Sequence, residues 1–221
     1  MSRPLAQGVI FDLDGTLVDT LADIATAMNS VLAARSLPVH PTRAYRPMLG
    51  LGVRNLVGLA LPETHRHPAL LEACVAEMMA AYGRRPLEAS RPYPGIPELV
   101  AELRRRGIPA AVLSNKPDAL TRAIVAGLLP DAGFRQVQGE RPGVPRKPDP
   151  AAALALCGVL GLAPAQVLLV GDSPVDLATA QRAGMPCASV LWGYSEEGEL
   201  QEAGARLRIP RPADLAPLLR P

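Results

Sequence analysis

The sequence predicts an α/β fold: a doubly wound parallel-sheet (Rossmann-like) core with a small helical cap inserted after the first strand. From Ile96 onward, helical and strand patterns alternate, which is typical of a parallel sheet with helices on both faces. The preceding segment, Leu17 to Arg91, shows helical spacing and no strand pattern. We therefore expect residues 1–16 and 92–221 to form the core and residues 17–91 to form the cap.

The first strand is the run Val9 to Phe11, which consists of β-formers without a polar break, as in a buried parallel strand. In the segment that follows, apolar residues recur with helical spacing between Pro-containing or Gly-containing loops. The elements expected there are a helix over 19–36, a loop over 37–47, helices over 52–61 and 69–82, and a loop over 83–95.

The remaining elements alternate in type, so each strand is followed by a crossover that returns the chain to the same sheet. The helices are expected over 97–106, 117–128, 150–160 and 175–183. The strands are expected over 109–113, 134–137, 167–170 and 188–191, with a weaker one over 206–209 before a C-terminal helical turn.

The composition and net charge of the chain limit the classes of protein to which it can belong. The chain has 221 residues, of which 48% are hydrophobic, and its net charge is +2, so we expect a sizeable core and no nucleic-acid partner. No apolar run approaches the ~20 residues that span a membrane, and we expect no signal peptide. Three widely spaced cysteines form no C-x-x-C pair, which favours reduced thiols in a cytoplasmic protein. We expect a monomer or homodimer.

Two carboxylates, Asp12 and Asp14, follow the first strand directly in the run GVIFDLDGT. Like charges held close together resist joint ionisation, so such a pair needs a cation or a shared proton. A simpler alternative is that the acidic residues and Gly15 only form a turn.

More polar groups are expected at the edge of the sheet where Asp12 lies, because ligands bind beyond the carboxyl ends of parallel strands. Each group also has a structural alternative, as a helix cap, part of a surface loop or a solvated helix residue. The groups are Ser114-Asn115-Lys116, Lys147, and the pair Asp172 and Asp176.

Lysine is rare in this chain. Among 23 cationic side chains only Lys116 and Lys147 are lysine, and all others are arginine. Arginine is a planar fork of donors, whereas lysine is a compact charge on a flexible stem. The neighbours of both lysines make retention by chance the less attractive interpretation.

In this order, the strand with D-x-D-G-T, Ser114, Lys147 and the run Gly171-Asp172-xxx-Asp176 resemble the four motifs of the haloacid dehalogenase-like hydrolases. The resemblance implies phosphoryl transfer in which Asp12 is the nucleophile and forms an aspartyl-phosphate. It implies that Asp14 protonates the leaving alcohol and then activates water. The dehalogenase branch lacks an acid at the Asp14 position, so hydrolysis of carbon–halogen bonds is disfavoured.

The resemblance also implies a Mg²⁺ site, and carboxylates are hard oxygen ligands suited to this ion. The expected ligands are Asp12, Asp14 through its backbone carbonyl, and Asp172, with Asp176 as a ligand or orienting group. Asp19 is expected to steady the loop between core and cap. The residues expected to bind phosphate or substrate are Thr16, Ser114, Asn115 and Lys147, of which Lys147 also offsets charge on Asp12 and the phosphoryl oxygens.

The position of the insertion resembles the small helical cap of the phosphoglycolate phosphatase and β-phosphoglucomutase branch. Three runs are similar to phosphoglycolate phosphatases: LGLGVRNLVGLAL, YPGIPELVAELRRRG and VLWGYSEEGEL. In the cap, Arg54 is a candidate to bind a substrate carboxylate or phosphate, because arginine binds anions through two donors. The alternative for Arg54 is a solvated helix charge.

The expected function is Mg²⁺-dependent hydrolysis of a small phosphorylated metabolite. A β-phosphoglucomutase-like phosphotransferase and a nucleotide or pyrophosphate phosphatase are the alternatives with similar caps. A non-catalytic binding protein would lack one of the four residues of the reaction, and all four are present: Asp12, Asp14, Lys147 and Asp172.

Overall fold

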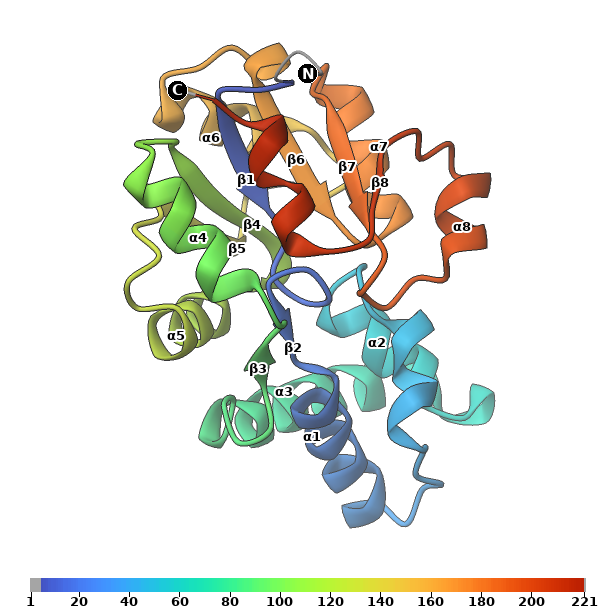
Figure 1. Cartoon of the computed structure of the whole chain (residues 1–221). Coiled ribbons are helices and arrows are strands. Elements are labelled where there is room, and N and C mark those ends of the chain that lie inside the picture. The colour runs from blue at the N-terminus through green and yellow to red at the C-terminus, as the bar shows by residue number, and fades with distance from the viewer. Residues whose placement is uncertain (1–4, 221) are drawn as a thin grey trace.

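The computed structural model describes residues 5–220 and has a six-stranded sheet at its centre (Figure 1). All five neighbouring pairs of strands are parallel. In spatial order the strands are β5 (Gln136–Glu140), β4 (Ala110–Pro117), β1 (Gly8–Phe11), β6 (Val167–Gly171), β7 (Cys187–Val190) and β8 (Arg208–Ile209). The expected fold class is confirmed, and the acidic run that follows β1 lies at the middle of one sheet edge.

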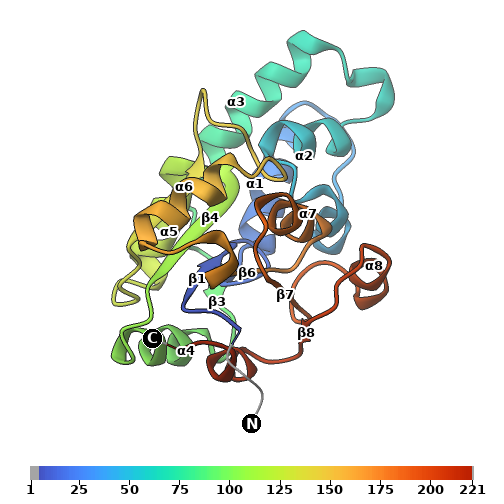
Figure 2. The same cartoon turned by 90° about the horizontal axis from the view of Figure 1, so that it is seen from above.

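Helices cover both faces of the sheet, and the side chains of β1 alternate between them. Ile10 packs into one core cluster, whereas Val9 and Phe11 pack into the other. Figure 2 shows α4 and α7 on opposite sides of the strands. The cluster around Phe11 includes residues of α4 (Ile96–Arg105) and α5 (Asp118–Leu128), and the cluster around Ile10 includes residues of α6 (Ala151–Leu160) and α7 (Pro174–Ala183).

Three helices lie beyond the carboxyl ends of the strands, where Figure 1 shows them in blue to teal. They are α1 (Leu21–Ala34), α2 (Val53–Ala60) and α3 (Pro68–Arg84), and α1 packs against α3. The loop expected over 37–47 is corrected in part, because Thr42–Met48 forms a 3₁₀ helix. Such short segments do not show the 3.6-residue spacing of apolar residues from which an α-helix is predicted.

The sequence patterns did not predict two further features, which are the β2–β3 pair and helix α8. No strand was expected between 17 and 92, yet β2 (Val18–Asp19) pairs antiparallel with β3 (Arg91–Pro92) where the chain leaves and re-enters the core. Two residues are too few to show an alternating pattern. Helix α8 (Glu197–Glu202) was also missed, because its six residues are mostly polar and only Leu200 is buried. Within residues 5–220, no helix is long and apolar enough to cross a membrane.

Truncation of a core side chain far from the strand ends tests the packing. Leu103 of α4 is 1% exposed, so Leu103→Ala is expected to lower the free energy of unfolding by about 2–5 kcal/mol. The exposed Leu154 is the matched control, and Leu154→Ala is expected to change it by less than about 0.5 kcal/mol. Urea unfolding followed by circular dichroism measures both, and equal losses would contradict this assignment of the core.

Candidate active site

The loop after β1 passes very close to the loop after β6. Gly15 has a φ of +85°, and a Cβ atom there would lie 2.2 Å from Oδ2 of Asp172. Glycine alone combines this backbone conformation with such a close approach. Gly15 therefore lets the loop after β1 pass directly against Asp172, a role beyond merely ending a strand.

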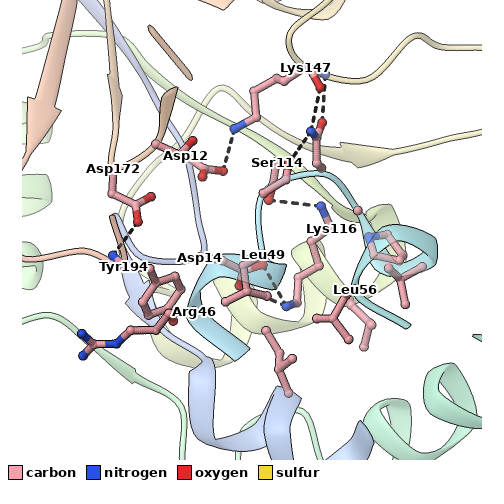
Figure 3. Close-up of a pocket in the computed structure, with 18 of the residues that line it drawn as sticks. Asp12, Asp14, Arg46, Leu49, Leu56, Ser114, Lys116, Lys147, Asp172 and Tyr194 are labelled. Atoms are coloured by element: carbon pink, nitrogen blue, oxygen red, sulfur yellow. Dashed lines mark hydrogen bonds and ion pairs between the residues drawn. The ribbon is translucent and has the colours of Figure 1, made fainter. Parts of the chain in front are cut away.

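Three buried carboxylates gather at this point (Figure 3 shows Asp12 and Asp172). Asp12, Asp172 and Asp176 each offer an oxygen, and these atoms lie within 4.8 Å of one another. Burial raises the pKa of Asp12 to about 7, with Asp176 and Asp14 adding to the shift and Lys147 opposing it. Burial and the neighbouring charges of Asp12 and Asp176 likewise raise the pKa of Asp172. An all-oxygen, under-neutralised cluster of this kind fits a hard divalent cation such as Mg²⁺.

Lys147 neutralises part of this negative charge. Its Nζ lies 2.9 Å from Oδ1 of Asp12 and 2.6 Å from Oδ1 of Asp176, and its side chain is 3% exposed. Burial opposes the charged form of Lys147, but the two carboxylates outweigh it and raise the pKa of the ammonium above its ordinary value. The surface-loop alternative for Lys147 is therefore excluded.

Asn115 holds the backbone of Lys147. Its Oδ1 accepts a hydrogen bond from the Lys147 amide at 2.9 Å, and its Nδ2 donates to the carbonyls of Lys147 at 2.9 Å and Gly50 at 2.7 Å. The structure thus brings Asn115 to the site with its side chain already bonded. Neither Ser114 nor Asn115 caps α5, because its N-cap is Pro117. Ser114 lines the pocket and keeps its hydroxyl hydrogen available for a ligand.

Two groups fix the carboxylate of Asp172. The hydroxyl of Thr16 donates to Oδ1 at 3.2 Å, and the backbone amide of Tyr194 donates to Oδ2 at 2.8 Å. Thr16 is fully buried and its hydroxyl is directed at Asp172. The hydroxyl of Tyr194 donates to Oδ1 of Asp19 at 3.1 Å, so Asp19 does lie in the junction between core and cap. Tyr194 was missed, since nothing in its local sequence marks a backbone donor.

Asp176 has both oxygens engaged. Oδ1 accepts from Lys147, and Oδ2 accepts from the hydroxyl of Ser173 at 2.6 Å within the cap of α7. Asp176 is 1% exposed, which excludes a solvated helix charge, and the N-cap of α7 is Ser173 and not Asp172. These contacts are typical of a group that orients its neighbours.

Asp14 lies apart from the carboxylate cluster. Nζ of Lys116 is 3.0 Å from both of its oxygens, and the hydroxyl of Thr20 donates to Oδ1 at 2.6 Å. Figure 3 shows the Asp14–Lys116 pair on the cap side of Asp12 and Ser114. The two adjacent carboxylates of the first motif therefore occupy different surroundings, one beside Lys147 and the other beside Lys116.

A pocket with a cavity volume of about 80 Å³ is lined both by these groups and by residues of the cap. Arg54 is not among its lining residues, because its guanidinium pairs with Glu72 and about half of its side chain is exposed. The only arginine that lines it, among the described residues, is Arg46. The apolar side of the pocket is formed largely by cap residues: Ile24, Leu49, Val53, Leu56, Met78, Met79 and Tyr82.

The two interpretations of Arg54 make different predictions. As an exposed ion-pair partner, Arg54→Ala is expected to change the free energy of unfolding by at most about 1 kcal/mol and to leave KM unaltered. Steady-state kinetics and urea unfolding check this result. A large rise in KM would show that Arg54 leaves Glu72 and reaches the substrate.

The sequence of this chain is similar to the sequences of known proteins. A family model described as haloacid dehalogenase-like hydrolase matches residues 6–184. The chain belongs to this family. The hydrolase is 38% identical over 199 residues to the phosphoglycolate phosphatase of Rhodospirillum rubrum, which covers 87% of this chain and 83% of the relative. It is 34% identical to phosphoglycolate phosphatase 1 of Pseudomonas aeruginosa, over 95% of this chain and 78% of the relative.

Two solved structures can be superposed on this chain over nearly its whole length. A crystal structure from Lactobacillus delbrueckii subsp. bulgaricus matches this hydrolase with a TM-score of 0.92 at 27% identity, covering 98% of this chain and 99% of that one. A predicted phosphoglycolate phosphatase from Haemophilus somnus matches with a TM-score of 0.87 at 28% identity, over 97% and 98% of the two chains. The hydrolase is thus a phosphatase of the phosphoglycolate phosphatase-like branch.

Proposed function

We propose that this hydrolase is a Mg²⁺-dependent phosphomonoesterase that acts through an aspartyl-phosphate on Asp12. The observation that carries the proposal is the separation of two carboxylates at one strand end. Asp12 lies between Lys147 and Asp172, whereas Asp14 lies against Lys116 at the pocket. One position suits a nucleophile beside a cation site, and the other suits a group that exchanges protons with the substrate.

In the first half-reaction, a carboxylate oxygen of Asp12 attacks phosphorus while the bond to the alcohol oxygen breaks. The electron pair of that bond leaves with the alcohol oxygen, which takes a proton from Asp14. Lys147 and the hydroxyl of Ser114 offset charge on the phosphoryl oxygens. Asp12, Asp172 and the backbone carbonyl of Asp14, with Asp176 as support, would hold Mg²⁺, which would supply further positive charge when bound.

In the second half-reaction, Asp14 is a carboxylate and accepts a proton from water. The water oxygen bonds to phosphorus, the bond from phosphorus to Asp12 breaks, and its electron pair returns to the Asp12 carboxylate. Inorganic phosphate leaves, and Asp14 again holds the proton that it donates in the next cycle. Both residues return to their starting states, so the two carboxylates complete the cycle with no other proton-transferring side chain.

We propose 2-phosphoglycolate as the first substrate to test. The relatives named above are phosphoglycolate phosphatases, and the pocket volume of about 80 Å³ suits a small leaving group. A panel containing 2-phosphoglycolate, a hexose phosphate, a nucleoside monophosphate and pyrophosphate separates this substrate from the other chemistries that similar caps accept.

Phosphate release from this panel, with Mg²⁺ and with a chelator, tests the proposal. Hydrolysis of 2-phosphoglycolate is expected to rank first, and chelation is expected to lower the rate at least ~10²-fold, because several kcal/mol of charge stabilisation are lost. If another phosphomonoester ranks first, the substrate is wrong and the reaction class stands. If no phosphomonoester is hydrolysed with Mg²⁺, the proposed function is wrong.

We also propose that the protein acts in the cytoplasm, as a monomer or homodimer. Three free cysteines and a net charge of +2 support a reducing location and the lack of a nucleic-acid partner. Light scattering coupled to size-exclusion chromatography measures the oligomeric state.

A further inference from the structure

A second buried ammonium lines the pocket, beside Asp14. Lys116, near the end of β4, has a side chain that is 4% exposed, and its Nζ lies 3.0 Å from both oxygens of Asp14. Burying a charge is costly unless the surrounding groups compensate for it. Lys116 is one of only two lysines in the chain, and the reaction steps above give it no task.

The surroundings of Lys116 come from three parts of the fold. Asp14 belongs to the loop after β1, Lys116 belongs to β4, and Tyr82 belongs to α3 of the cap. Nζ of Lys116 lies 4.6 Å from the centre of the Tyr82 ring, and Tyr82 is 4% exposed. An ammonium is attracted to the face of an aromatic ring, and more strongly where water is excluded. The cap therefore supplies part of the environment that keeps Lys116 next to Asp14.

The contacts leave Asp14 with one open direction for a proton. A carboxylate has about four lone-pair sites on its two oxygens. Lys116 occupies one site on each oxygen, and the hydroxyl of Thr20 occupies the second site on Oδ1. The site that stays open is on Oδ2, so this oxygen is the one placed to give and take the proton.

We propose that Lys116 is a positioning residue that fixes the Asp14 carboxylate for proton transfer through Oδ2, and that Tyr82 completes the environment of Lys116. Docking of the cap then helps to orient Asp14, which couples cap docking to protonation of the leaving group. The inference rests on the proposed function, because it assumes that Asp14 exchanges protons with the alcohol.

A purely structural ion pair predicts a different result. Loss of structural support lowers the rates of all substrates by similar factors. Misplacement of an acid lowers the rates most for substrates whose leaving group needs a proton. An alkoxide needs one, whereas 4-nitrophenolate leaves readily without it. The ratio of kcat/KM for an alkyl phosphate to kcat/KM for 4-nitrophenyl phosphate therefore reports the position of Asp14, because kcat/KM covers the steps through formation of the aspartyl-phosphate.

The experiment compares these two substrates, with the best alkyl phosphate of the panel, in the full chain with Mg²⁺. Lys116→Met is expected to lower the ratio at least ~10-fold, since a misplaced acid forfeits part of its 10²–10⁴-fold contribution. Tyr82→Leu is expected to lower it ~2- to 10-fold, in line with one lost cation–π contact. Tyr82→Phe keeps the ring and is expected to keep the ratio. Arg122→Met removes an exposed cation paired with Asp118 and is the control.

An unchanged ratio in Lys116→Met would overturn the positioning role, and an unchanged ratio in Tyr82→Leu would overturn the coupling to the cap. In the Asp14→Asn background, Lys116→Met is expected to lower the ratio no further, and an additive loss would also overturn the proposal. If Lys116→Met does not fold, Tyr82→Leu still tests the inference, because it leaves Lys116 and Asp14 in place. A wild-type protein that hydrolyses neither substrate would refute the proposed function itself, which is a distinct outcome.

Discussion

Replacement of Asp12 by asparagine is expected to abolish turnover and, in the absence of divalent cations, to raise thermal stability. An amide cannot form the acyl-phosphate, so kcat is expected to fall by ~10³-fold or more. Phosphate release from 2-phosphoglycolate with Mg²⁺ measures this loss. Undiminished activity in Asp12→Asn would contradict the assignment of Asp12 as the nucleophile.

The gain in stability follows from the charges of the cluster. Asp12, Asp172 and Asp176 carry three negative charges against the single positive charge of Lys147 when all are ionised. Asparagine has nearly the shape of aspartate and removes one of those charges, so repulsion falls while packing is kept. Sites that bind a cation are commonly stabilised by such changes at the expense of activity.

The pH dependence of this gain has a definite sign. Burial raises the pKa of Asp12 from 3.8 to about 7, so the folded state binds this proton more tightly than the unfolded state. The resulting contribution to stability is present at low pH and is lost as the pH rises from about 4 to about 7. The difference in melting temperature between Asp12→Asn and wild type is therefore expected to grow over this range and then level off. Scanning calorimetry with a chelator measures it, and added Mg²⁺ is expected to reduce the difference.

Most of the site could be anticipated because its chemistry is concentrated at the ends of a few strands. Asp12 and Asp172 follow β1 and β6, which pair directly, so a parallel sheet brings them together without further information. The contacts that could not be anticipated join side chains that no strand pairing places side by side. Thr16 and Asp172 are 156 positions apart, and Arg54 and Glu72 lie on different helices. No local period encodes such pairings.

The structure of the cap was harder to predict from the sequence than that of the core, for a related reason. Its helices show clear apolar spacing, but the strands β2 and β3 and the 3₁₀ helix Thr42–Met48 are too short for any period to appear. Lys116 stood out by its rarity and by its place after a strand, whereas its partner Tyr82 has the pattern of an ordinary apolar position of α3. Tertiary packing, and not local sequence, makes that tyrosine a neighbour of the first motif.

Lys147→Met is expected to have the opposite effect on stability from Asp12→Asn. It leaves the three carboxylates without their cation, and breaking a buried ion pair by removing one partner costs about 3–5 kcal/mol. Activity is expected to be lost as well, since the proposed neutralisation of the phosphoryl oxygens by Lys147 is removed. Urea unfolding with a chelator and phosphate release with Mg²⁺ measure the two effects, with Arg122→Met as the exposed-cation control.

The dependence of the stability of Lys147→Met on Mg²⁺ and on pH distinguishes loss of the lysine charge from loss of its side-chain packing. A bound divalent cation is expected to restore much of the stability of Lys147→Met but not its activity, because the carboxylates, and not the lysine position, would hold the ion. The pKa of Lys147 is raised above its ordinary value, so its stabilising charge is fully present below that value and does not vary between pH 6 and 9. Any change in the stability difference over this range therefore comes from the carboxylates, whose ionisation the missing ammonium no longer supports, and the difference is expected to grow with pH. A loss that is independent of both pH and Mg²⁺ would mean that the lysine stem contributes packing alone, and it would contradict the charge cluster on which the nucleophile assignment also depends.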